Sequence, residues 1–100
     1  MLRRTYSILM KTPIGDRKGM LEVQIERDRA TGRLEILKHR EPFDGSVDAD
    51  GYCRITGRLV TLMQTIPYTA TGRMMPDSLS LRLEGGRNIF RITGVIHPEG

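Results

Sequence analysis

An acidic stretch at residues 44–51, Asp-Gly-Ser-Val-Asp-Ala-Asp-Gly, holds residue types that bind calcium. Calcium-binding loops place oxygen ligands at alternate positions, a glycine at the sixth position and a bidentate glutamate at the twelfth. Counted from Asp44 or from Ser46, the twelfth position falls on Ile55 or Gly57, and neither can supply a carboxylate. Aspartate and glycine both favour tight turns. The last four residues of the stretch are therefore predicted to form a turn and not a metal site.

The single cysteine and the two histidines form the second candidate group. Cys53 could act as a nucleophile if His39 or His97 lay beside it. No third group that would orient an imidazole is evident, and His97 lies in a segment expected to be a C-terminal tail. The paired ligand spacing of zinc sites is also missing. The sequence therefore predicts no catalytic residue, no metal ligand and no cofactor, and an enzyme is not favoured. Cys53 is expected to be a small buried apolar residue.

The basic composition is the third candidate. The net charge is +4, and 13 of the 16 basic residues are arginine, whose planar guanidinium suits phosphates and carboxylates. Barrels that bind single-stranded nucleic acid also stack bases on aromatic side chains. The aromatic residues here mostly fall at positions needed for a core: Tyr6, Phe43, Tyr52, Tyr68 and Phe90. Weak binding of single-stranded nucleic acid stays an alternative, and a solvated arginine-rich surface explains the charge equally well.

The compartment follows from the same composition. No run of apolar residues approaches the length of a membrane span. The apolar run that begins at Tyr6 is too short, and too soon interrupted by charge, for a secretory signal. A lone thiol fits a reducing compartment. A cytoplasmic protein is expected.

Alternation of apolar and polar residues runs through most of the chain and is clearest in residues 76–96. Leu79, Leu81 and Leu83 share one face, a Gly-Gly pair at 85–86 interrupts, and β-branched and aromatic residues resume. Period two is typical of strands, and glycine suits hairpin turns. The predicted strands are residues 4–11, 20–27, 33–38, 43–47, 52–64, 68–74, 79–84 and 89–96.

These strands predict an all-β fold in one domain, residues 1–100. About eight short strands with hairpin-length connections favour an antiparallel up-and-down β-barrel, and strands of six to nine residues favour an interior filled by side chains. A small or branched apolar residue followed by Thr-Gly recurs, ending at Gly32, Gly57, Gly72 and Gly94. Glycine at such steps relieves curvature at barrel corners, and a bend is expected at Gly57.

The turn chemistry resembles that of a group of small uncharacterised bacterial proteins. Residues 12–15 (Thr-Pro-Ile-Gly), 19–21 (Gly-Met-Leu), 42–45 (Pro-Phe-Asp-Gly) and 48–51 (Asp-Ala-Asp-Gly) are similar to that group's Thr-Pro-Met-Gly, Gly-x-Leu, Pro-Phe-Ser-Gly and Asp-Gly-Asp steps. Ile14 stands where the group has methionine. The resemblance implies a calycin-like β-barrel and no catalytic residue.

Two functions are expected of such a barrel. The segment that starts at Tyr52 is apolar on both faces, so Tyr52, Val60 and Leu62 are predicted to form a homodimer or partner interface of a non-enzymatic interaction module. Alternatively, Tyr6, Tyr52 and Tyr68 bind a small apolar or aromatic ligand at one mouth, a reading that six adaptable methionines favour. Both readings stay open.

Overall fold

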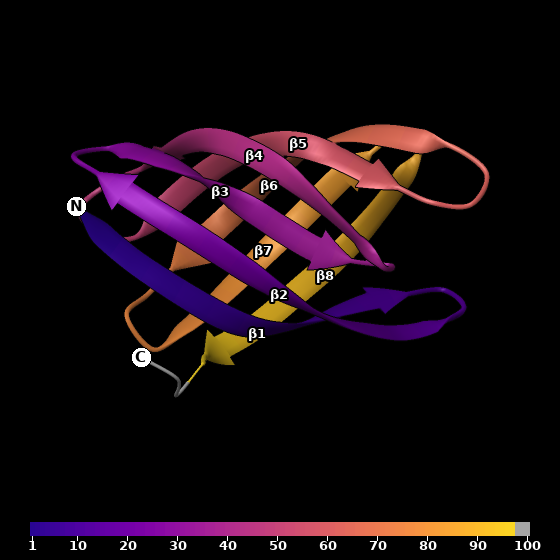
Figure 1. Cartoon of the computed structure of the whole chain (residues 1–100), viewed down its shortest axis with the longest axis horizontal. Coiled ribbons are helices and arrows are strands. Elements are labelled where there is room, and N and C mark those ends of the chain that lie inside the picture. The colour runs from indigo at the N-terminus through magenta and orange to yellow at the C-terminus, as the bar shows by residue number, and fades with distance from the viewer. Residues whose placement is uncertain (98–100) are drawn as a thin grey trace.

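The computed structural model describes residues 1–97, which form eight strands and no helix. The strands are β1 (Leu2–Thr12), β2 (Gly15–Glu26), β3 (Arg29–Ile36), β4 (His39–Val47), β5 (Tyr52–Val60), β6 (Thr65–Met74), β7 (Ser78–Gly85) and β8 (Asn88–Ile96). Each strand pairs antiparallel with the next, and β8 pairs with β1 (Figure 1). The predicted fold, a closed up-and-down barrel of eight strands, is confirmed.

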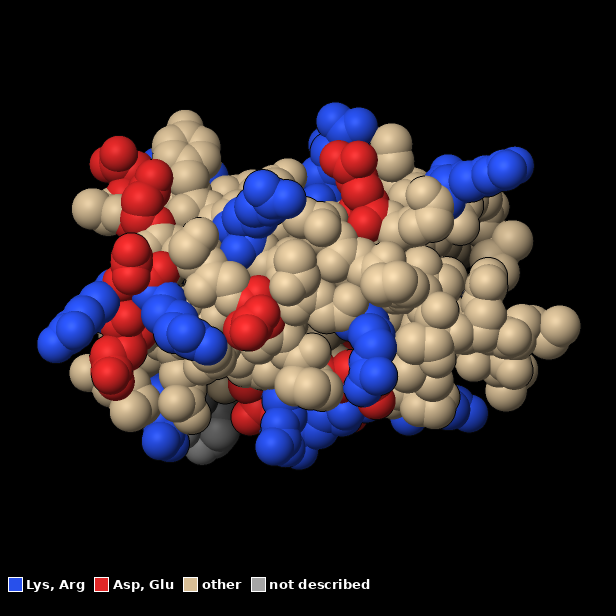
Figure 2. Space-filling view, turned by 90° about the horizontal axis from the view of Figure 1, so that it is seen from above, with Lys and Arg blue, Asp and Glu red and all other residues tan. Residues whose placement is uncertain are grey.

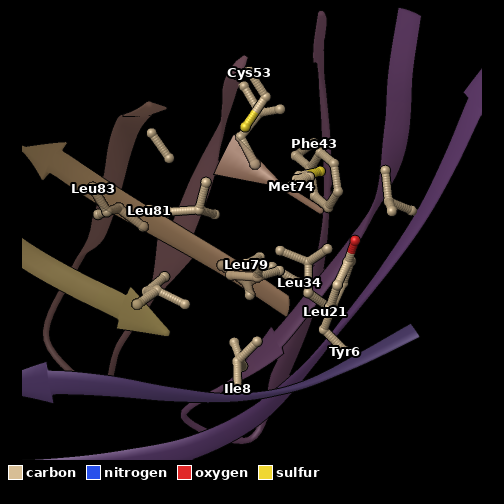
Figure 3. Close-up of a cluster of buried hydrophobic side chains, with 14 of the residues drawn as sticks. Tyr6, Ile8, Leu21, Leu34, Phe43, Cys53, Met74, Leu79, Leu81 and Leu83 are labelled. Atoms are coloured by element: carbon tan, nitrogen blue, oxygen red, sulfur yellow. The ribbon is translucent and has the colours of Figure 1, made fainter. Parts of the chain in front are cut away.

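Strict alternation builds the core, because successive side chains of a strand point to opposite faces. The inward residues of β7 are the three leucines whose spacing predicted this hairpin, and side chains from the other strands meet them (Figure 3). Twenty apolar side chains are buried, and within residues 1–97 no charged or polar residue is. The interior is therefore filled. The buried set is Tyr6, Ile8, Met10, Leu21, Val23, Ala30, Leu34, Ile36, Phe43, Val47, Cys53, Ile55, Leu59, Tyr68, Ala70, Met74, Leu79, Leu81, Leu83 and Ile92.

Two interior aromatic rings lie over glycines of neighbouring strands. Phe43 pairs with Gly32 on one side and with Gly57 on the other, and Tyr68 pairs with Gly57 across the next ladder. A Cβ atom at Gly32 would lie 2.9 Å from the Phe43 ring and 1.9 Å from the carbonyl oxygen of Glu22. A Cβ atom at Gly57 would lie 2.6 Å from the Tyr68 hydroxyl. The Thr-Gly steps thus provide the room that a tightly coiled sheet needs.

The first hairpin extends further than the sequence indicates. The expected break at residues 12–19 is wrong, because β1 and β2 stay paired up to Thr12 and Gly15, and only Pro13 and Ile14 remain as the turn. The β1–β8 ladder ends at Lys11, and the β2–β3 ladder does not extend beyond residue 20. Residues 12–19 therefore project beyond the barrel wall as a first finger.

The β5–β6 hairpin forms a second finger, residues 58–67, because pairing to β4 ends at Gly57 and pairing to β7 ends at Tyr68. Pro42 on β4 and Pro67 on β6 lie one residue beyond those ends, where a missing N–H costs no ladder hydrogen bond. Residues 39–42 and 65–67, expected as loop or turn, are strand, whereas residues 61–64, expected as strand, form the fingertip loop.

Both fingers project from the same end of the barrel, together with the β3–β4 and β7–β8 turns (Figure 1). This finger end lies opposite the terminal end, which carries the N-terminus and the β2–β3, β4–β5 and β6–β7 connections. The wall is open between β4 and β5 at the finger end, where Arg58 Nη2 lies 3.2 Å from Glu41 Oε1. The ends of the barrel therefore differ in shape.

The β3–β4 turn at the finger end has two residues with left-handed backbone conformations. Leu37 has φ 55° and Lys38 has φ 66°, between the paired residues Ile36 and His39. A two-residue turn with positive φ at both positions favours Asn-Gly, because a bulky residue there costs about 1 to 2 kcal/mol. This turn is therefore strained.

Adding a methyl group at Gly32 should strongly destabilise the barrel. The Cβ atom would meet the backbone carbonyl of Glu22, which cannot move without breaking the β2–β3 ladder. We expect Gly32→Ala to lower the free energy of unfolding by about 3 kcal/mol, measured by urea denaturation followed by circular dichroism. Ser80→Ala, at an exposed position of β7, should change it by less than about 0.5 kcal/mol. Equal stability of the two variants would contradict the close-approach argument.

Relieving the left-handed turn should stabilise the protein. Lys38→Gly removes the steric cost of a positive φ, and we expect the free energy of unfolding to rise by about 1 kcal/mol. Lys11→Gly, at an exposed strand position, should lower it by about 0.5 to 1 kcal/mol. Urea midpoints should therefore rise for Lys38→Gly and fall for Lys11→Gly. A lower midpoint in both variants would contradict the strain in the β3–β4 turn.

Candidate functional site

Two of the three tyrosines expected at a ligand mouth are core residues. The Tyr6 side chain is fully buried, its hydroxyl donates to the Met75 carbonyl oxygen at 2.6 Å, and it accepts from Arg4 Nη1 at 3.3 Å. Burial raises the pKa of Tyr6, and the nearby Arg4 charge partly offsets this. Tyr6 therefore ties β1 to the β6–β7 connection near the terminal end.

Tyr52 lies outside the barrel wall, 56% exposed, at the start of β5. The Arg73 guanidinium carbon lies 4.7 Å from the centre of its ring, and Arg73 Nη2 donates to the Asp50 carbonyl oxygen at 2.9 Å. Tyr52 belongs to the terminal end, whereas Val60 and Leu62 lie at the finger end of the same hairpin. The three residues named for an interface thus span the outer length of β5.

Tyr68 is the described residue whose buried side-chain polar atom lacks a hydrogen-bond partner. It points into the barrel from β6, two residues after Ile66 and farther from the fingertip, and is 4% exposed. Burial raises the pKa of its phenol, because the charged form has no compensating partner. Its hydroxyl lies beside Gly57, next to the opening between β4 and β5. The structure thus separates the three tyrosines and does not form one site from them.

The possible Cys–His pair is not supported by the placement of Cys53 and His39. Cys53 is 7% exposed near the terminal end of β5, and burial raises the pKa of its thiol to about 11. His39 is exposed at the start of β4, at the finger end. The backbone N–H of His97 donates to the Thr5 carbonyl oxygen, and the rest of the expected tail, residues 98–100, lies outside the described residues. No group of metal-binding side chains forms within residues 1–97.

The acidic stretch forms the turn that its composition indicates. Asp48 Oδ1 accepts hydrogen bonds from the backbone N–H groups of Asp50 at 2.9 Å and Tyr52 at 3.0 Å. The carboxylate of Asp48 therefore satisfies the backbone of the β4–β5 turn, which is an ordinary role for aspartate in such turns.

A hollow with a volume of about 830 Å³ lies between the two fingers. Its floor consists of core side chains at the mouth of the barrel, Met10, Leu59 and Phe90. Its sides are mostly apolar and come from both fingers and the strained turn: Thr12, Pro13, Ile14, Leu37, Thr61, Leu62, Met63 and Ile66. Pockets that hold small ligands have volumes of about 300 to 1,000 Å³ and mostly apolar walls.

The rim of this hollow is cationic. Arg17 and Lys18 line it from the first finger, Lys38 and His39 from the β3–β4 turn, and Asn88 from β8. None of the described lining residues is acidic, and Arg17, Lys18 and Lys38 form no ion pair within residues 1–97. In the view of Figure 2, acidic side chains lie away from the projecting right-hand end. The hollow therefore combines an apolar floor with unneutralised positive charge.

Sequence reasoning missed this hollow because residues 12–19 were assigned to a break between strands and residues 61–63 to a strand with an interface residue, Leu62. A signal was present, since apolar Ile14, Leu62 and Met63 occupy hairpin tips where polar residues are usual. Which tips lie side by side depends on the barrel register, which local alternation does not specify.

Comparisons with protein families, with characterised proteins and with solved structures find no match to this chain. Within residues 1–97, no helix is long and apolar enough to cross a membrane.

Removing the unpartnered hydroxyl should stabilise the barrel. We expect Tyr68→Phe to raise the free energy of unfolding by about 1 kcal/mol at neutral pH, because the fold no longer buries an unpaired polar group. Tyr52→Phe, at an exposed ring, is the matched control and should change little. A destabilised Tyr68→Phe variant would show that the hydroxyl has a partner in the folded protein.

The same variant should alter the response to alkaline pH. The unfolded chain ionises Tyr68 near the ordinary pKa of 10.0, whereas the folded protein holds that pKa higher. Ionisation therefore favours the unfolded state, and the stability present below pH 10 is lost as the pH rises above it. Urea midpoints of Tyr68→Phe should fall less steeply than those of the native protein in this range, while Tyr52→Phe should follow the native protein.

Proposed function

We propose that the protein is a binding module for a small amphiphile, a molecule with an apolar chain or ring and one anionic group. The observation that carries the proposal is the hollow between the fingers, where an apolar floor adjoins Arg17, Lys18 and Lys38 without a neutralising carboxylate. An apolar body resting on Met10, Leu59 and Phe90 would leave its anionic group among these cations.

The proposed ligand lies at the mouth and not inside the barrel, because side chains already fill the interior. Eight-stranded barrels either fill with side chains or hold one small ligand. Here the core occupies the inside, and the fingers extend the wall around a space above it. The resemblance to calycin-like bacterial proteins supports a ligand-binding barrel, and membership of that group is part of the proposal.

Binding is the activity that these side chains support. Among the described lining residues His39 is the one side chain of a type that often serves as an acid or base, and no carboxylate or thiol accompanies it. A lone exposed imidazole lacks the second group with which acid–base or nucleophilic chemistry is usually performed.

The other expectations from the sequence stay predictions. A homodimer through Tyr52, Val60 and Leu62 would run along the outer edge of β5. Binding of single-stranded nucleic acid would use Tyr52, whose ring already lies against Arg73. The cytoplasmic location is a prediction of the same kind.

Calorimetric titration with dodecanoate, and with dodecyltrimethylammonium as its cationic counterpart, tests the proposal below micelle-forming concentrations. Dodecanoate should bind and the cation should not, because the rim is positive. Removing one rim charge in Lys18→Gln should weaken dodecanoate binding several-fold at low salt and little at high salt, since salt screens exposed charges.

A variant of Phe90, on the floor of the hollow, tests the apolar part of the proposed site. Phe90→Ala should weaken dodecanoate binding about tenfold, the equivalent of about 1.4 kcal/mol of lost apolar contact. Ile89→Ala, the adjacent residue of β8, is 54% exposed and does not line the hollow, so it should bind like the native protein. Equal binding by both variants, or no binding of dodecanoate at all, would refute the amphiphile site.

A further inference from the structure

The tips of both fingers carry large apolar side chains that nothing in the described chain covers. Ile14 on the first finger is 84% exposed, and Leu62 and Met63 on the second are 101% and 91% exposed. Figure 1 shows the two tips projecting from the same end of the barrel. The same three side chains also form part of the sides of the hollow. Their exposure therefore indicates a second contact beyond the hollow.

Several polar groups of the second fingertip are hydrogen-bonded within the loop. Thr61 Oγ1 donates to the Gln64 carbonyl oxygen at 2.9 Å and accepts from the N–H groups of Met63 at 3.3 Å and Gln64 at 3.1 Å. The N–H of Thr61 also donates to the Gln64 carbonyl oxygen at 2.9 Å. Moving Leu62 and Met63 into an apolar medium would leave these groups hydrogen-bonded, which lowers the cost of burying the loop.

The first fingertip has a similar arrangement. Thr12 Oγ1 donates to the Gly15 carbonyl oxygen, and Pro13 has no N–H to satisfy. Ile14 is the residue between them. Both fingers therefore present an apolar tip above a threonine that closes the turn.

Cationic side chains lie behind the tips. Residues 11–19 contain Lys11, Arg17 and Lys18 against one acidic residue, Asp16, and Lys38 lies in the neighbouring β3–β4 turn. Residues 58–67 contain no acidic residue. We call Lys11, Arg17, Lys18 and Lys38 the collar. Apolar tips in front of this positive collar match a bilayer surface, whose apolar region lies below negatively charged headgroups.

A second copy of this chain fits the same end less well. Contact between two finger ends would oppose two cationic rims, with Asp16 as the only nearby opposite charge on these fingers. The two tips are also separate projections and not one flat patch (Figure 1). A fluid surface accepts separate tips, whereas a rigid partner must match both at once.

We propose that the finger end docks on anionic lipid bilayers, with Ile14, Leu62 and Met63 inserted at the interface and the cationic side chains of the collar on the headgroups. The proposed docking is inferred from the exposed tips and does not depend on a ligand in the hollow. It orients the mouth of the hollow toward the lipid.

Co-sedimentation with vesicles tests the docking. The native protein should bind vesicles of phosphatidylcholine with phosphatidylglycerol and bind vesicles of phosphatidylcholine alone several-fold less, because the collar needs negative headgroups. The triple variant Ile14→Ser, Leu62→Ser, Met63→Ser should lose binding by at least tenfold. Val95→Ser, which changes a side chain that is 62% exposed on the wall of the barrel, should bind like the native protein.

Three outcomes would overturn the docking. The first is failure to bind the anionic vesicles, and the second is equal binding by the native protein and the triple variant. A native dimer in analytical ultracentrifugation that the triple variant dissociates would instead identify a second copy as the occupant and would also overturn it.

A further variant separates this proposal from the amphiphile site. Phe90→Ala should keep vesicle binding while weakening dodecanoate binding, because Phe90 lies on the floor and not at a tip. Dodecanoate binding without vesicle binding would remove the docking alone, and vesicle binding without dodecanoate binding would remove the amphiphile site alone.

Discussion

The close approach of neighbouring backbones is the constraint on which this barrel depends. Eight strands close around a packed core only if the sheet coils tightly, and at Gly32 the Glu22 carbonyl oxygen occupies the place that a Cβ atom would take. The ring of Phe43 lies against Gly32, and the Tyr68 side chain lies against Gly57. The glycines and the aromatic rings therefore depend on each other, because each ring occupies space that a side chain at the paired glycine would take.

The fingers arise where the ladders stop. Pro42 and Pro67 lie just beyond the last pairs of the β4–β5 and β6–β7 ladders, so the β5–β6 hairpin separates from both neighbours without leaving unpaired donors at these positions. The same separation opens the wall beside the Tyr68 hydroxyl and leaves the Arg58–Glu41 pair across the gap. One local change in pairing thus produces the hollow, the opening and an unpartnered buried phenol.

The two ends of the barrel use their charges differently. At the terminal end, Arg4 donates to Tyr6, and Arg73 lies against Tyr52 and donates to the Asp50 carbonyl oxygen, so these cations hold connections together. At the finger end, Lys18 and Lys38 border apolar surface and have no carboxylate beside them in the hollow. Cations without an ion pair within the described residues therefore adjoin exposed apolar surface at the finger end, which is the physical basis of both proposals.

Local pattern in the sequence determined the strands, their inward faces and the closed barrel, because period-two burial and turn chemistry act over a few residues. Leu79, Leu81 and Leu83 lie on the inner face as their spacing predicted, and Asp48 closes the turn that its neighbours indicated. Only the tertiary structure decided how far each hairpin stays paired and which tips lie together. Ile14 and Leu62 are separated along the chain by four strands, β2 to β5, and they reach one end because the register of all eight strands places them there. Register is set by the sum of cross-strand contacts around the closed sheet, and no single segment carries that sum.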